Sequence, residues 1–183
     1  KIFASVSVTA CWAISMYALY VYLGAALFSS NKFSSPEIAA AIIFYGIGAV
    51  IGSLIGGQLT DRFGERKISK VTLIFLSLIL VCLGIFFTSG IWLFFFLFLW
   101  ALIGYAGFTS YTARLAVEYP NERGSIMAWN MTALYIGITL GSMLGGFIIS
   151  KWGYSYLPYV CSIAAILSFI LSTQKVKKTK TVQ

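Results

Sequence analysis

The sequence predicts an all-α integral membrane protein, with six transmembrane helices that form two inverted three-helix repeats within one domain, 1–183. Three observations lead to this prediction. Of the 183 residues 60% are apolar and only 10% are charged, long uncharged stretches separate small clusters of charge, and one glycine-rich segment occurs twice. Because an ordinary soluble domain is about half apolar and about a quarter charged, this composition favours the lipid bilayer as the surroundings of the chain.

The uncharged stretches define each helix, since about 20 apolar residues are needed to cross the hydrocarbon core. The longest stretch, 71–113, is interrupted by Thr88-Ser89-Gly90 and therefore holds the end of one helix and most of the next. The helices are expected at about 2–28, 36–58, 68–87, 92–113, 124–149 and 154–173. The first repeat then covers about 1–87, the second about 92–173, and residues 174–183 form a cytoplasmic tail.

Two loops carry signals for helix starts. In Ser35-Pro36-Glu37 a hydroxyl cap precedes a proline at the first helical position and an acid in the first turn, which is typical of a helix N-terminus. Pro120-Asn121-Glu122 similarly precedes the fifth helix. Cys11, Cys82 and Cys161 lie inside predicted spans and are interpreted as packing residues.

The distribution of lysine and arginine predicts the orientation in the membrane. Six spans place both chain ends on one side, where 11 of the 13 basic residues fall, whereas only Lys32 and Lys151 fall on the other side. By the positive-inside rule the termini and the loops 59–70 and 114–123 are cytoplasmic. The first span is too long for the apolar core of a signal peptide and lacks a cleavage pattern. The expected location is the plasma (inner) membrane of a prokaryote.

The same composition disfavours several classes of function. The chain has no histidine, and its five acidic residues lie in loops or at helix ends, so we expect no catalytic centre, no metal site and no cofactor. A formal charge of +8 is compatible with nucleic-acid binding, but the basic residues are scattered among apolar runs and form no polar face. We therefore expect no nucleic-acid partner.

A repeat with a shift of 89 residues joins the two parts of the chain. The segment 48–57 aligns with 137–146, and Arg62-Phe63-Gly64 aligns with Lys151-Trp152-Gly153. One copy ends at a charged cytoplasmic loop and the other at a nearly neutral external loop, so the two triplets of helices are related by inversion, as in secondary transporters. Each copy has a glycine at every fourth position, which clears one helix face for close packing; these glycines are Gly48, Gly52, Gly56, Gly137, Gly141 and Gly145.

The loop after the second helix carries a recognisable motif. Its residues resemble the signature G-x-L-a-D-r-x-G-r-k of the major facilitator superfamily, with Glu65 in place of the usual basic residue; the matching positions are Gly57, Leu59, Asp61, Arg62, Gly64 and Arg66. A second resemblance is to helix 11 and its preceding loop in the drug and small-solute proton-antiporter branch; it comprises Pro120, Arg123, Gly124, Asn130, Tyr135, Gly137, Gly141, Ser142, Gly145 and Gly146.

The resemblance implies one half of a twelve-helix fold, because members of this superfamily have two six-helix halves. The chain resembles the C-terminal half, helices 7–12, so its implied partners are the missing N-terminal half, the lipid bilayer and a small-molecule substrate. In the family the signature acts as a cytoplasmic latch, in which an acid faces the positive start of a helix from the other half. The resemblance assigns Asp61 as the latch acid, organised by Arg62, Arg66 and Arg114, whereas Lys67 and Lys70 are interpreted as orientation signals alone.

In this fold the first, second, fourth and fifth helices of a half line the substrate cavity. The candidates in this sequence are aromatic residues and the one amide within a span: Trp12, Tyr20, Trp100, Tyr111, Asn130 and Tyr135. An uncharged aromatic cavity suits drugs and other weakly polar solutes, exported in exchange for protons, and suits sugars less well. The alternatives are a sugar or metabolite transporter of the same superfamily, a membrane enzyme and a non-transporting membrane scaffold. Since every acid lies in a loop or at a helix end, a coupling carboxylate is expected in the partner half.

Overall fold

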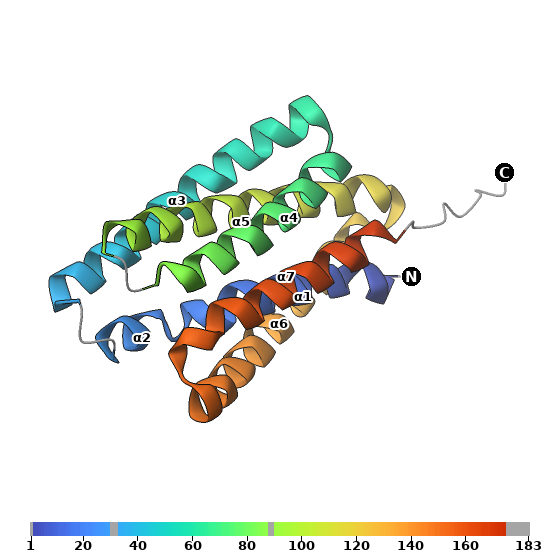
Figure 1. The fold of residues 1–183 in the computed structure, drawn as a ribbon. Helices are drawn as coiled ribbons and strands as arrows, with labels where there is room; N and C mark the ends of the chain where they lie inside the picture. Colours follow the sequence, from blue (N-terminus) through green and yellow to red (C-terminus); the bar gives the residue numbers. More distant parts are fainter. Residues whose placement is uncertain (1, 30–32, 88–89, 175–183) are drawn as a thin grey trace, which may run out of the picture.

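The computed structural model describes residues 2–29, 33–87 and 90–174, which are almost entirely helical (Figure 1). The α-helices are α1 (Ile2–Tyr20), α2 (Leu23–Ser29), α3 (Ser35–Phe63), α4 (Glu65–Ile85), α5 (Ile91–Glu118), α6 (Arg123–Trp152) and α7 (Leu157–Thr173). Short 3₁₀ turns, Pro120–Glu122 and Tyr154–Tyr156, precede α6 and α7. Lys1, Lys32, Thr88, Ser89 and most of the predicted tail, 175–183, lie outside the described residues.

Six helical segments of the described chain are long and apolar enough to cross a membrane, with α1 and α2 together forming the first. The predicted six-span, all-α membrane fold is therefore confirmed. Several helices extend further than predicted at their charged ends, since α3 continues to Phe63 and α5 to Glu118. Figure 1 shows both ends of the described chain at one end of the bundle, as an even number of spans requires.

The first span is broken, which the sequence analysis did not predict. At the break the backbone N–H of Val21 reaches the carbonyl of Tyr17 at 3.3 Å, and Tyr22 bonds instead to Leu19, three residues back, at 3.1 Å. The tighter turn separates α1 from α2 although neither proline nor glycine stands there. Tyr22 is fixed on α6, because its hydroxyl donates to the carbonyl of Ser142 at 2.9 Å.

The start of α3 lies one residue from the predicted position. Ser34 and not Ser35 is the N-cap, because the Glu37 carboxylate accepts hydrogen bonds from both the backbone N–H and the hydroxyl of Ser34. Two turns correspond between the repeats: α3 ends at Gly64 and α6 ends at Gly153, and both glycines have a φ of 86°. This is a left-handed conformation that side chains disfavour, so glycine at both positions lets the chain turn directly into the next segment.

The two repeats are joined through glycine-bearing helix faces, and each repeat contributes one such face to a helix of the other repeat. The second helix of each repeat packs along the first helix of the other repeat, α3 along α5 and α6 along α1. On Gly48, Gly52 and Gly56 an added Cβ would collide with the backbone of Phe98, Leu102 and Ala106. On Gly137, Gly141 and Gly145 it would press against the backbone of Ala10, Ile14 and Ala18. The six predicted packing glycines therefore all lie where two helix backbones approach closely.

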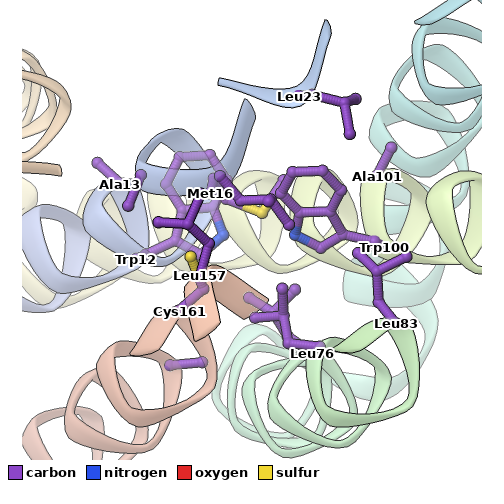
Figure 2. Packing of buried hydrophobic residues seen from close by; sticks show 14 of the residues in the cluster. Trp12, Ala13, Met16, Leu23, Leu76, Leu83, Trp100, Ala101, Leu157 and Cys161 are labelled. Atoms are coloured by element: carbon purple, nitrogen blue, oxygen red, sulfur yellow. The ribbon is translucent and has the colours of Figure 1, made fainter. Parts of the chain in front are cut away.

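The core lies where α1 and α5 cross, with α4 and α7 completing it. Trp100, Met16, Leu76 and Cys161 are fully buried there, and Figure 2 shows Met16 between the indole rings of Trp12 and Trp100. The three cysteines are free thiols, and each is at least half-buried. Two serines bind α4 to α7, since the Ser162 hydroxyl donates to the carbonyl of Ser77 at 3.0 Å.

Candidate functional site

The signature motif forms the turn between α3 and α4. Asp61 and Arg62 lie exposed in the last turn of α3, and the guanidinium of Arg62 lies 5.2 Å from the centre of the Phe63 ring. Among the described residues Asp61 has no hydrogen bond and no ion pair. Gly57, one turn earlier, has open space where a side chain would project. The six-helix bundle itself thus leaves both the acid and the adjacent glycine uncovered.

Glu118, and not Asp61, is the acid that pairs with Arg66 and Arg114. Its Oε1 accepts from Nε of Arg114 at 2.9 Å and from Nε of Arg66 at 3.0 Å. The side chains of Glu118 and Arg114 are only 4% and 6% exposed, whereas that of Arg66 is 60% exposed. Arg66 and Arg114 were assigned to Asp61 by the family resemblance, and Glu118 was not identified from the sequence as their partner. The sequence signal for this pair was the four-residue spacing of Arg114 and Glu118, because side chains four residues apart on a helix are neighbours.

The buried ion pair also ties down the end of α7. Nη1 of Arg114 donates to the backbone carbonyl of Ser172 at 2.9 Å, and the guanidinium lies 5.6 Å from the centre of the Tyr111 ring. Tyr111 in turn donates to the carbonyl of Ser5 on α1 at 2.7 Å. A single buried arginine therefore connects α5 with α7, and its ring neighbour connects α5 with α1. This leaves Asp61 as an unpaired carboxylate among the described residues, beside a cluster in which Glu118 neutralises the buried Arg114.

A second group of polar side chains is the tyrosine surface, made of Tyr17, Tyr20, Tyr45 and Tyr105. Tyr20 stacks on Tyr45 with ring centres 4.6 Å apart, and Tyr45 meets Tyr105 edge-on at 6.3 Å. The hydroxyls of Tyr17 and Tyr105 are 3.4 Å apart. Tyr17, Tyr20 and Tyr105 are partly exposed, while Tyr45 is buried and its hydroxyl has no partner among the described residues. Helices α1, α3 and α5 thus combine phenol groups without any charged residue.

The six predicted cavity residues divide into two groups. Trp12, Trp100, Tyr111 and Asn130 are buried inside the bundle, whereas Tyr20 is half-buried and Tyr135 is 66% exposed. Asn130 packs between helices, since its Oδ1 accepts from the Thr9 hydroxyl at 2.6 Å. A pocket of about 10 Å³, lined by residues that include Trp12 and Tyr111, has room for one water molecule and none for a solute. The structure therefore brings only Tyr20 and Tyr135 of this set to the surface.

A heptapeptide repeat underlies the tyrosine surface and was missed in the sequence analysis. Residues 12–18 read W-A-I-S-M-Y-A and residues 100–106 read W-A-L-I-G-Y-A, with a shift of 88. The glycine segments align with a shift of 89, so a comparison made at that shift alone separates the two copies by one residue. In the structure Trp12 corresponds to Trp100 and Tyr17 to Tyr105. The hydroxyls of these two equivalent tyrosines contact each other, so the first helices of the two repeats also meet at this point.

Comparison with known proteins agrees with this architecture. The chain is 31% identical over 175 residues to the uncharacterized MFS-type transporter YwfA of Bacillus subtilis (strain 168), covering 94% of this chain and 42% of that protein. It is 26% identical over 182 residues to the inner membrane transport protein YdhP of Escherichia coli (strain K12), covering 97% and 46%. It is 30% identical over 152 residues to the probable galactarate/D-glucarate transporter GudP of Bacillus subtilis (strain 168), covering 79% and 33%.

The chain spans less than half the length of these relatives. The family model of the Major Facilitator Superfamily matches residues 4–182, nearly the whole chain. The six apolar helices of the described chain, arranged as two three-helix repeats, agree with one half of that family's fold. The chain is an integral membrane protein that belongs to the Major Facilitator Superfamily.

Proposed function

We propose that the chain is the C-terminal six-helix half of a secondary active transporter, which works by alternating access and exports drugs or other small, weakly polar solutes in exchange for protons. The tyrosine surface is the observation that supports this best. Tyr17 and Tyr105 meet where the two repeats join, and secondary transporters hold their substrates at such a junction. Family membership and relatives named as transporters support the general activity.

The chemistry of the tyrosine surface favours uncharged or positively charged solutes with apolar bodies. Tyrosine rings offer apolar faces of negative potential, and their hydroxyls supply a few hydrogen bonds. Among the described residues no cation lies in this region to hold an anion. A sugar or metabolite transporter is the second candidate, supported by the similarity to GudP, a probable galactarate/D-glucarate transporter. An acid substrate would then take its cation from the partner half.

The partner half is expected on the faces of α3 and α6. These are the least covered spans, since only 22% and 28% of an 18-residue apolar segment in each is buried inside the described bundle. Large apolar side chains stand exposed along them, including Val50 and Leu54 on α3 and Met143 and Phe147 on α6. A second bundle of the same architecture would cover these faces, and the relatives are long enough to contain one.

Asp61 is the proposed latch between the halves. It is exposed and unpaired in the described bundle, while the start of a helix offers partial positive charge and free N–H groups. A helix start in the partner half would complete the pair on the cytoplasmic side in one of the two access states. The positive-inside rule supports this side, because Arg62, Arg66 and Lys67 flank Asp61.

Flux measurements with an imposed pH gradient test the function. The complete protein, with both six-helix halves, is reconstituted in vesicles beside the 183-residue chain alone. We expect gradient-dependent flux of a lipophilic drug only from the complete protein, because the acids of the described spans stand only at helix ends and none lies at the middle of a span. Flux of galactarate but not of the drug would favour the metabolite transporter. The absence of flux for any solute would favour the scaffold, and gradient-dependent flux from the chain alone would contradict a coupling acid in the partner half.

A further inference from the structure

The two equivalent tryptophans differ in their hydrogen bonding. The indole N–H of Trp12 donates to the backbone carbonyl of Gly104 at 3.0 Å. Trp100 stands 88 residues later, in the second copy of the heptapeptide, and is fully buried. Its indole N–H finds no acceptor among the described residues. An unpaired donor in an apolar core is costly, so its presence in one repeat and not in the other needs an explanation.

The missing acceptor can be identified by the repeat. The acceptor of Trp12 is the carbonyl of residue 104, and the equivalent of that residue in the first repeat is Met16. Figure 2 shows the Met16 side chain between the two indoles, and a Cβ added to Gly104 would lie 2.6 Å from the sulfur of Met16. Gly104 has no side chain, whereas the Met16 side chain fills the space between the two indoles. The sequence difference at this pair of positions therefore separates the paired indole from the unpaired one.

Inverted repeats give such an asymmetry a functional meaning. If two repeats of similar sequence adopt different local conformations, exchange of those conformations gives a second structure that is open to the opposite side of the membrane. The bond made by Trp12 in one structure is then made by Trp100 in the other. The contact between Tyr17 and Tyr105 joins equivalent residues, so the exchange leaves it in place.

We propose that the two indoles form an exchangeable pair of hydrogen bonds that sets the balance between the access states. In the described conformation Trp12 donates to the carbonyl of Gly104 and Trp100 is unpaired. In the opposite-facing conformation the Trp12 bond breaks, the Met16 side chain moves aside and Trp100 donates to the carbonyl of Met16. This inference rests on the proposed alternating-access function, and each bond stabilises one state only.

Two equivalent positions on the faces expected to meet the partner half can report the balance, because each is reached by water only when its end of the protein is open. Leu54 on α3 and Met143 on α6 correspond at the shift of 89 and are 65% and 67% exposed in the described bundle, toward opposite ends. In the complete protein without Cys11, Cys82 and Cys161, single Leu54→Cys and Met143→Cys reporters are alkylated in lipid nanodiscs without substrate. The ratio of the two rates measures which end of the protein is open.

Trp12→Phe and Trp100→Phe are the test, because each keeps an aromatic ring and removes one N–H. We expect them to change the ratio in opposite directions, each by about fivefold, as the loss of one ordinary hydrogen bond allows. Tyr17→Phe and Tyr105→Phe are the matched control pair and should leave the ratio nearly unchanged, since either removes the same contact and that contact is present in both states. Where a phenylalanine variant fails to fold, benzothienylalanine at the same position keeps the bicyclic ring without the N–H.

Shifts in the same direction, or an unchanged ratio in both tryptophan variants, would overturn the exchange. Flux of the unsubstituted protein is measured separately. If the ratio shifts in opposite directions but no solute crosses the membrane, the exchange stands and the proposed transport activity fails. If solute crosses normally and the ratio does not respond, transport stands and the exchange fails.

Discussion

Arg114 donates from Nε to Oε1 of Glu118 at 2.9 Å, and both side chains are buried at the end of α5 where Arg66 reaches the same oxygen from α4. Burial of a charge is tolerated only with a partner, so the carboxylate and the guanidinium depend on each other. The geometry accounts for the closed packing of α4, α5 and α7 at this end of the bundle and separates a structural acid, Glu118, from the exposed acid Asp61.

The first prediction concerns this pair. Glu118→Gln removes the charge that compensates Arg114 and should lower the free energy of unfolding by about 3 kcal/mol, within the usual range for a broken buried ion pair. Arg66→Gln is the matched control, because it loses a bond to the same oxygen from an exposed side chain and should cost less than about 1 kcal/mol. Thermal unfolding in detergent compares the two variants. Equal losses would show that Arg114 and Glu118 are not the dominant pair.

The second prediction concerns Asp61. Asp61→Asn keeps the shape of the side chain and removes its charge, so transport by the complete protein should be strongly reduced while its amount in the membrane stays near normal. Since Asp61 is exposed and has no partner in the described bundle, its loss should not weaken the fold. Flux and membrane abundance are measured on the same vesicles. A drop in abundance that matches the drop in flux would favour a structural role instead.

The third prediction concerns the glycine faces. Gly52→Leu and Gly141→Leu should each prevent correct folding, because a side chain at either position meets the backbone of the neighbouring helix. Gly46→Leu is the control: it lies on the same helix as Gly52 but has no atom within 4 Å of an added Cβ. Size-exclusion profiles in mild detergent distinguish folded from aggregated protein. If both the Gly52→Leu and the Gly141→Leu protein were monodisperse, neither glycine face would be required for helix packing.

The fourth prediction concerns orientation. Cysteines placed at Lys32 and Lys151 should react with a membrane-impermeant reagent added outside intact cells, whereas a cysteine at Lys67 should react only after the cells are opened. Lys67 lies beside the signature turn, so its labelling also locates Asp61. The reverse pattern would place the termini outside and would contradict a cytoplasmic latch.

The spans were predictable because the bilayer permits few charges, so the charged residues of this sequence mark the helix ends directly. The cap of α3 was misplaced by one residue, because Ser34 and Ser35 are both capping residues and only the reach of Glu37 chooses between them. The break at Val21 and Tyr22 has no local sequence signal. It coincides with a contact to α6 that sequence reasoning cannot place.

The site was predicted less well, for a different reason. The family resemblance assigned Arg66 to Asp61, but in the described bundle Arg66 pairs with Glu118 on a neighbouring helix, a contact that depends on how the helices pack. Trp12 and Trp100 were assigned to a cavity from their residue type and from the helices that line the cavity in the resembled fold, but both side chains are buried at the centre of this bundle. The first helices of the two repeats align at a shift of 88 and the second helices at a shift of 89. A separate alignment of the first helices would have revealed both the tryptophan and the tyrosine pairs.

Because each glycine-bearing helix packs on a helix of the other repeat, the glycine faces also constrain the order in which the helices can assemble during synthesis. The uncovered glycines of α3 find their partner only when α5 has emerged from the ribosome, and α1 receives α6 later still. Each early helix must therefore remain in the bilayer with its closest contact unmade. Neither triplet buries its own glycines, so we expect a three-helix fragment expressed alone to be degraded, and the two triplets expressed together to protect each other.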